Sequence, residues 1–169
     1  MGVHDPLQSA VAAICCNLLL PLRKVNDIFE TALGRALKKT EVEFHCGVVN
    51  VNHYHLVVSD ATKPELGEFL RELNKVAAVE LNRCHGKDGP VFRAHYHDEP
   101  LEDPDEILNA MAYTLTNPVK DGLVRAMKDW PYTDAFGPAY QRGRVSTLEH
   151  RPSNEERAEV TSAWPGVRF

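Results

Sequence analysis

The sequence lacks the features of a membrane-spanning or disulfide-rich protein. No segment approaches the run of about 18 uncharged apolar residues that crosses a bilayer as a helix. The most apolar stretch, from Ala10 to Leu22, is interrupted by Asn17 and Pro21 and has no basic region ahead of it. The four cysteines show no Cys-x-x-Cys spacing. We therefore expect a soluble, cytoplasmic protein with reduced thiols and no membrane association.

The sequence also has no excess of basic residues, because 19 lysines and arginines are opposed by 24 acidic residues and the formal net charge is −5. Proteins that bind nucleic acids through the phosphate backbone usually carry a net positive charge. Composition alone therefore argues against such binding. The basic residues are unevenly distributed, however, and residues 71–93 hold enough of them to form a local basic surface.

A chain of 169 residues, of which 43% are hydrophobic, is long enough for one sizeable core and too short for two full domains. Beyond Tyr132, glycine, proline, arginine and serine become frequent and the hydrophobic periodicity weakens. We expect a folded domain over residues 1–132 and a loosely structured C-terminal tail over residues 133–169.

Hydrophobic periodicity predicts both helices and strands. Apolar residues recur every three or four positions from Lys24 to Lys39, as in an amphipathic helix. Residues 41–51 and 53–59 are rich in valine and indicate two successive strands, which we expect to form an antiparallel hairpin. A second amphipathic helix is predicted from about Pro64 to Gly86. Residues 91–101 are predicted as a strand or an extended connection.

A third helix is indicated by Asp103, a good N-cap residue, followed by Pro104 and Glu106. We expect it to end near Asn117, because Pro118 disfavours a helical conformation of the residue before it. Its apolar residues form one stripe, which consists of Ile107, Leu108, Met111 and Leu115.

A His-Tyr-His motif lies within the predicted strand 53–59. Alternate side chains of a strand point to opposite faces, so His53 and His55 lie on one face, roughly 7 Å apart, and Tyr54 lies on the other. Two histidines in this position can share a metal ion; an ordinary pair of surface or core histidines is the alternative. A second motif at residues 95–97 is followed by acidic residues and a proline, which are less suited to a central strand.

The third predicted helix places Tyr113 nearly opposite its apolar stripe, with Asn117 one turn further along the same face. Two imidazoles and the side-chain oxygen of Asn117 suit Mg²⁺ or Mn²⁺, and such an ion would polarise a scissile phosphate. The Tyr113 hydroxyl would then attack phosphorus and form a phosphotyrosine bond that a free DNA hydroxyl can reverse. An exposed tyrosine and an asparagine that terminates the helix are the alternative interpretation.

Several sequence blocks together resemble the REP-associated tyrosine transposases of the HUH single-tyrosine transposase superfamily, over roughly residues 24–131. These blocks are residues 52–58 (NHYHLVV), 69–75 (FLRELNK), 81–86 (LNRCHG), 89–92 (GPVF) and 113–124 (YTLTNPVKDGLV).

The resemblance implies an α+β fold, ferredoxin-like or RRM-like, in which helices pack on a central antiparallel sheet. It implies that His53, His55 and Asn117 hold the metal and that Tyr113 is the nucleophile. The expected substrate is single-stranded DNA with hairpin-forming ends, and the protein would work as a monomer or a homodimer. Tyr96 is available for base stacking. Phosphate contacts are assigned to Arg71, Lys75, Arg83, Arg93 and Lys120.

Some features depart from this family and leave other functions open. Relatives usually begin with a polar and basic strand, whereas residues 10–20 are apolar, so we expect an altered N-terminal edge. The acidic net charge and the weakly patterned tail are compatible with a domesticated protein that binds DNA without cutting it. A zinc-stabilised domain is a further alternative. Its ligands would come from His45, Cys46, Cys84, His85, His95 and His97.

Overall fold

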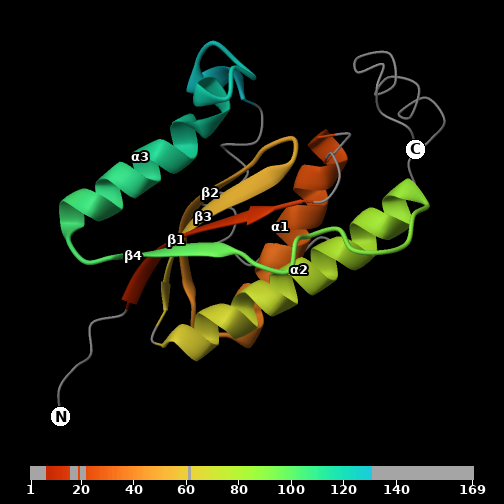
Figure 1. Cartoon of the computed structure of the whole chain (residues 1–169), viewed down its shortest axis with the longest axis horizontal. Coiled ribbons are helices and arrows are strands. Elements are labelled where there is room, and N and C mark those ends of the chain that lie inside the picture. The colour runs from red at the N-terminus through yellow and green to blue at the C-terminus, as the bar shows by residue number, and fades with distance from the viewer. Residues whose placement is uncertain (1–6, 16–18, 20–21, 61, 131–169) are drawn as a thin grey trace.

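The computed structural model describes residues 7–15, 19, 22–60 and 62–130 (Figure 1). The predicted tail over residues 133–169 lies outside the described residues and stays a prediction. No helix in the described ranges is long and apolar enough to cross a membrane. The elements are β1 (Leu7–Ile14), α1 (Leu22–Lys39), β2 (Glu43–Val49), β3 (His53–Asp60), α2 (Lys63–His85), β4 (His97–Leu101), α3 (Pro104–Lys120) and the 3-10 turn η1 (Met127–Asp129).

The four strands form one antiparallel sheet in the order β2-β3-β1-β4. Because α1 follows β1 and α2 follows β3, the strands and these helices make the βαββαβ unit of ferredoxin-like folds. The helices α1 and α2 cover one face of the sheet, and α3 lies on the other (Figure 1). The predicted α+β fold, the β2–β3 hairpin and the first two helices are confirmed.

The strand β3 divides its side chains between the two layers. Tyr54, Leu56 and Val58 belong to the core beneath α1 and α2. The Tyr54 hydroxyl donates a hydrogen bond of 2.8 Å to Oδ1 of Asn74 in α2, and its ring meets that of Phe29 in α1 edge-on at 5.3 Å between centroids. By the two-residue period of a strand, the histidines on either side of Tyr54 face α3.

The expected difference of the N-terminal edge from that of relatives stays a prediction, but the residues there still form β1, a regular strand in the middle of the sheet between β3 and β4. Its sequence, LQSAVAAI, contains three alanines, a residue that is depleted in strands. A strand that is paired on both edges receives its stability from its neighbours, so weak intrinsic preference did not prevent it from forming.

The helix α3 does not end at Asn117 as expected, because it continues through Pro118 to Lys120. Proline lacks an N–H donor and clashes with the preceding turn, but here it lies in the last turn of the helix. The backbone N–H of Asp121 still donates to the Asn117 carbonyl at 2.9 Å, and that of Leu123 donates to Pro118 at 2.9 Å. The final turn therefore closes despite the proline, and it carries Lys120 and Asp121 round to the sheet.

The apolar stripe of α3 is not its buried side. The buried residues of this helix are Thr114, Asn117 and Pro118, whereas Leu108 is 63% exposed. The predicted N-cap is confirmed, since the Asp103 side chain accepts from the backbone at the start of the helix. A side with small and polar residues thus faces the sheet, which leaves room above the histidines.

We expect the hydrogen bond of the Tyr54 hydroxyl to contribute measurably to the stability of the protein. Changing Tyr54 to Phe leaves Oδ1 of Asn74 without its donor inside the protein, so we expect the free energy of unfolding to fall by about 1–2 kcal/mol. Urea denaturation of both proteins measures the difference. Tyr96→Phe, in which an exposed tyrosine loses the same atom, should change stability by less than about 0.5 kcal/mol. Equal effects of the two changes would contradict the prediction.

The contact between Lys39 and Glu72 predicts a pH-dependent link between α1 and α2. Lys39 Nζ lies 2.7 Å from the carboxylate of Glu72, and this hydrogen bond lowers the pKa of that buried carboxyl. The unfolded chain then binds more protons than the folded one as pH falls from about 4.3, so the stabilisation is present above this pH and is lost below it.

We expect Lys39→Met to lower the free energy of unfolding at pH 7 by roughly 1 kcal/mol. The difference from wild type should shrink as the pH falls through the pKa of Glu72 in the folded protein. Denaturation series at several pH values measure it. Lys38→Met, at the neighbouring exposed position, is the control, and a difference that persists unchanged in acid would refute this account.

Candidate functional site

The two histidines of β3 lie side by side beneath α3. The ring centroids of His53 and His55 are 4.9 Å apart, and their planes are nearly perpendicular at 88°. Both rings are half-buried. Because β3 is hydrogen-bonded to β2 on one edge and β1 on the other, the backbone holds these side chains in fixed positions.

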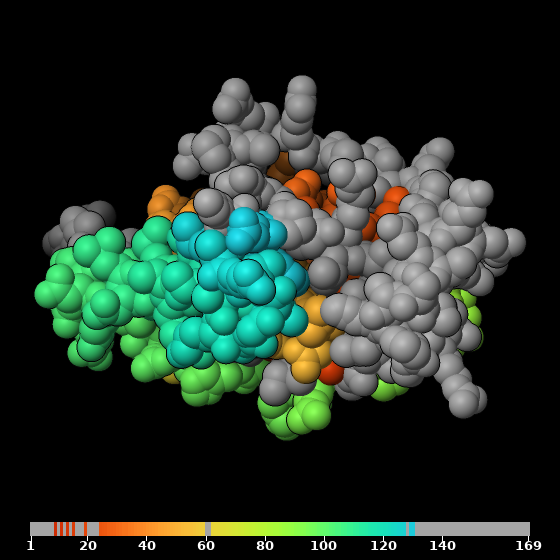
Figure 2. Space-filling model, turned by 90° about the horizontal axis from the view of Figure 1, so that it is seen from above, coloured from red at the N-terminus to blue at the C-terminus, as the bar shows by residue number. Residues whose placement is uncertain are grey.

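The helix α3 brings two further side chains to the histidines. The ring centroid of Tyr113 is 5.7 Å from that of His55, and Oδ1 of Asn117 is 3.2 Å from Nε2 of His53. Asn117 is buried, whereas Tyr113 keeps 46% of its surface exposed. Figure 2 shows α3 in green and the segment after it in cyan, both at the surface. The structure thus brings together the four residues predicted from the sequence, and their chemical roles stay predictions.

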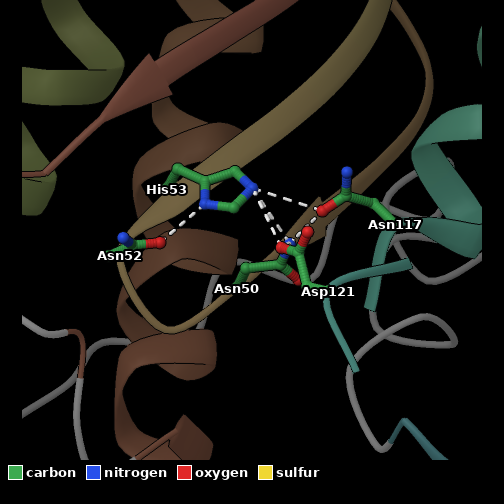
Figure 3. Close-up of polar contacts among 5 residues, drawn as sticks. All are labelled: Asn50, Asn52, His53, Asn117 and Asp121. Atoms are coloured by element: carbon green, nitrogen blue, oxygen red, sulfur yellow. Dashed lines mark hydrogen bonds and ion pairs between the residues drawn. The ribbon is translucent and has the colours of Figure 1, made fainter. Parts of the chain in front are cut away.

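His53 makes polar contacts through both ring nitrogens (Figure 3). Its Nδ1 is 2.7 Å from Oδ1 of Asn52, an oxygen that only accepts, so Nδ1 carries the proton. The second nitrogen, Nε2, faces the side-chain oxygens of Asn117, at 3.2 Å, and Asp121, at 3.6 Å. Metal-binding histidines commonly show this arrangement, in which one nitrogen is oriented by an acceptor and the other is free to bind.

The turn between β2 and β3 connects the sheet to the end of α3. The side chain of Asn50 in this turn is fully buried, and its Nδ2 lies 3.1 Å from Nε2 of His53 and 3.2 Å from Oδ2 of Asp121. The same nitrogen donates to Oδ1 of Asn117. The backbone of the turn is held by a 2.8 Å hydrogen bond from the Cys15 N–H to the Asn52 carbonyl.

The residues Asn50, Asn52 and Asp121 were missed by the sequence analysis. Asp121 lies four positions after Asn117 and eight after Tyr113, so a helix continued past Pro118 would have placed all three on one side. The expected helix end at Asn117 concealed this signal. Asn50 and Asn52 lie in the turn of a hairpin, where asparagine is common for its turn-forming preference. Nothing in the sequence alone distinguished them from ordinary turn residues.

The environment of His55 favours its neutral form. Burial, followed by repulsion from His53 and from Lys120, lowers the pKa of this ring to about 4, although attraction to Asp121 acts in the opposite direction. At neutral pH the imidazole of His55 is therefore uncharged, which is the state that binds a metal ion.

Lys120 is the predicted phosphate-binding residue that the fold brings to this site, since its Nζ lies 4.0 Å from the ring centroid of Tyr113. Other predicted residues are elsewhere. Arg71 and Arg83 lie on α2, beyond the opposite face of the sheet, and form salt bridges of 2.9 Å and 2.6 Å with glutamates of the same helix. Lys75 is exposed on α2, and Arg93 is exposed in the segment before β4. Their contact with DNA stays a prediction.

A cavity of about 490 Å³ opens beside Tyr113, between α3 and β4. His97 lines it, because His97 and His55 both pair with Ala12 and therefore lie in one row across the sheet. One histidine of the second His-Tyr-His motif thus adjoins the first motif, although it lies on the edge strand. The cavity lining also includes Thr114, Glu99 and Glu106. Tyr96, the residue before His97, is partly exposed. Base stacking by Tyr96 stays a prediction.

The positions of the histidines and cysteines do not support the zinc site that was the alternative interpretation of the sequence. Within the described ranges, no group of three or more His, Cys, Asp or Glu side chains is arranged to hold a metal ion. Nε2 of His45 contacts the hydroxyl of Ser59 at 2.5 Å, whereas Cys84 belongs to the core under α2.

Comparison with known proteins agrees with this geometry. No family model matches the chain. A Haemophilus influenzae protein whose name assigns it to the REP-associated tyrosine transposases is 30% identical over 67 residues, which are 39% of this chain and 38% of that protein. The chain thus matches well under half of the length of this relative.

Two solved structures match the chain to different degrees. The first, a REP-associated tyrosine transposase bound to a REP hairpin, has a TM-score of 0.67 and 15% identity and covers 90% of this chain and 98% of its own. The second, described as a transposase of Deinococcus radiodurans R1, has a TM-score of 0.44 and 10% identity over 64% of this chain and 89% of its own. The resemblance predicted from the sequence is therefore confirmed: the chain has the fold of a REP-associated tyrosine transposase and is similar to that family in sequence over part of its length.

Proposed function

We propose that this protein is a transposase of the HUH single-tyrosine type, which cuts and rejoins single-stranded DNA beside hairpins through a phosphotyrosine intermediate. The observation that carries the proposal is the meeting of Tyr113 and Asn117 on α3 with His53 and His55 on β3. The names of the similar proteins support transposition, and the hairpin bound by the first solved structure supports hairpin DNA as the partner.

The site residues fit a divalent metal ion. Nε2 of His53 presents its lone pair to the same space as Oδ1 of Asn117, and the neutral ring of His55 lies against His53. Nitrogen and oxygen donors of this kind suit Mn²⁺ or Mg²⁺. When bound there, the ion would polarise the scissile phosphate and offset the charge that develops on it.

The residues of the chain supply the nucleophile and its orientation. The Tyr113 oxygen forms a bond to phosphorus and loses its proton to water, while the bond from phosphorus to the leaving strand oxygen breaks and that oxygen takes a proton from water. The products are a phosphotyrosine and a free DNA hydroxyl, and attack by such a hydroxyl reverses the step without a nucleotide cofactor. Lys120, which lies over the Tyr113 ring, would attract the phosphate to this position.

A second candidate is a protein of the same fold that binds DNA hairpins without cutting. It is favoured by the net charge of −5 and by the carboxylates of Glu99 and Glu106 in the cavity beside Tyr113, which repel phosphate. The two candidates differ in one product, the covalent link between protein and DNA.

We expect Tyr113→Phe to abolish covalent protein–DNA adducts while hairpin affinity changes less than about threefold, since the change removes one exposed hydroxyl and no core volume. Denaturing gels of labelled hairpin DNA incubated with Mn²⁺ detect the adduct, and filter binding measures affinity. Tyr96→Phe is the matched control and should still form the adduct. Persistence of the adduct in Tyr113→Phe would assign the nucleophile to another residue, and absence of any adduct with wild type would favour the non-cleaving protein.

The two His-Tyr-His motifs predict unequal effects on cleavage. His53→Ala and His55→Ala should each reduce Mn²⁺-dependent cleavage by about 100-fold or more, because each removes a metal ligand. His97→Ala, which alters the cavity wall, should have a smaller effect, and His95→Ala should have the least. Single-turnover cleavage rates of the four variants provide the measurement. A larger loss of cleavage rate from the His95 or His97 change than from the His53 or His55 change would show that the second motif, and not the first, binds the metal ion.

A further inference from the structure

The amide nitrogen of Asn50 lies among more hydrogen-bond acceptors than it can serve (Figure 3). Nε2 of His53 is 3.1 Å away, Oδ2 of Asp121 is 3.2 Å away, and Oδ1 of Asn117 also contacts it. An amide nitrogen carries two hydrogens, so it can donate to at most two of these three atoms at a time. The other end of the same side chain, Oδ1 of Asn50, is buried and has no partner in the described part of the chain.

Asn50 and Asn117 are buried here, whereas the side chains of His53 and Asp121 keep 20% and 38% of their surface exposed, so a cation could reach these atoms from solvent. Three atoms of different side chains converge here, one imidazole nitrogen, one amide oxygen and one carboxylate oxygen. The Asn50 nitrogen, which carries only a partial positive charge, occupies the point on which they converge. A divalent ion would satisfy all of them at once.

Two separations measured from Nε2 of His53 can be compared with the ligand spacing of an octahedral ion. An ion with ligands at about 2.1 Å holds neighbouring ligand atoms about 3 Å apart. Nε2 of His53 is 3.2 Å from Oδ1 of Asn117 and 3.6 Å from Oδ2 of Asp121. The separation from Asn117 is thus close to this spacing, and the carboxylate of Asp121 would have to move toward His53 by about half an ångström.

The position of Asp121 makes this contact a consequence of the fold. Its backbone N–H closes the last turn of α3 on the Asn117 carbonyl at 2.9 Å, so the two side chains project from adjacent turns of the same helix. Asp121 also supplies what the predicted ligand set lacks, because two neutral imidazoles and an amide carry no charge. Mg²⁺ and Mn²⁺ bind preferentially to anionic oxygen.

From this geometry we infer that Asp121 is a ligand of the divalent metal ion, together with His53 and Asn117, and that Asn50 holds these three side chains together beneath it. The inference rests on the metal site of the proposed function and adds a carboxylate to it. The ligand class is a hard divalent cation, for which the probe is Mn²⁺.

The test is Mn²⁺ binding by the full chain without DNA, measured by calorimetry and by the electron paramagnetic resonance of free Mn²⁺. We expect Asp121→Ala to weaken Mn²⁺ affinity at least about tenfold, and Asp121→Asn, which keeps the shape and loses the charge, to weaken it as well. Asp88→Asn, which removes one exposed carboxylate outside the site, is the matched control and should bind as wild type does. Circular dichroism of each variant verifies folding.

The outcomes separate this inference from the proposed function. If His53→Ala abolishes Mn²⁺ binding while both Asp121 variants bind as wild type does, Asp121 is no ligand and the metal site of the proposed function survives. If wild type itself binds no Mn²⁺, both statements fail. If Asp88→Asn weakens binding as much as Asp121→Asn, the effect is one of net charge and the inference is overturned.

Discussion

The two-residue period of β3 is the constraint on which the rest of the site depends. Tyr54 is fixed in the core by Asn74 and by the ring of Phe29, and with the buried Leu56 and Val58 it decides which face of the strand carries His53 and His55. Moving the strand by one residue would bury both imidazoles and expose the tyrosine. The core beneath α1 and α2 therefore determines where the two imidazoles lie on the opposite side of the sheet.

The parts predictable from the sequence are those whose signal is local. The hairpin and the first two helices follow from periodicity, and the His-Tyr-His motif follows from strand alternation. The strand β1 was missed because its alanines have weak strand preference and its stability comes from pairing on both edges. The apolar stripe of α3 also failed to identify its buried side, because Thr114 and Asn117 are the residues that this helix buries. Residues that serve a site and not the core are where hydrophobic pattern misleads.

The distribution of basic residues bears on how a chain with a net negative charge could bind DNA. Arg71 and Arg83 are engaged by glutamates of their own helix, so the cluster of basic residues that the sequence indicated is largely neutralised where it lies. Lys120, in contrast, faces an aromatic ring. One cation that adjoins the reacting group has more influence on a phosphate than several that are paired at a distance, because Coulomb energy falls with separation and with screening.

The continuation of α3 through Pro118 places Tyr113, Asn117 and Asp121 on successive turns of one rigid rod. Their spacing along the axis, about 6 Å per step, is set by the helix itself and not by tertiary packing. A small sliding or tilting of this helix over β2 and β3 would therefore carry all three side chains in concert, leaving their mutual distances unchanged while altering their distances to the histidines. Tyr113, Asn117 and Asp121 would then move as a single unit, and the sheet provides the fixed counterpart against which this unit is aligned.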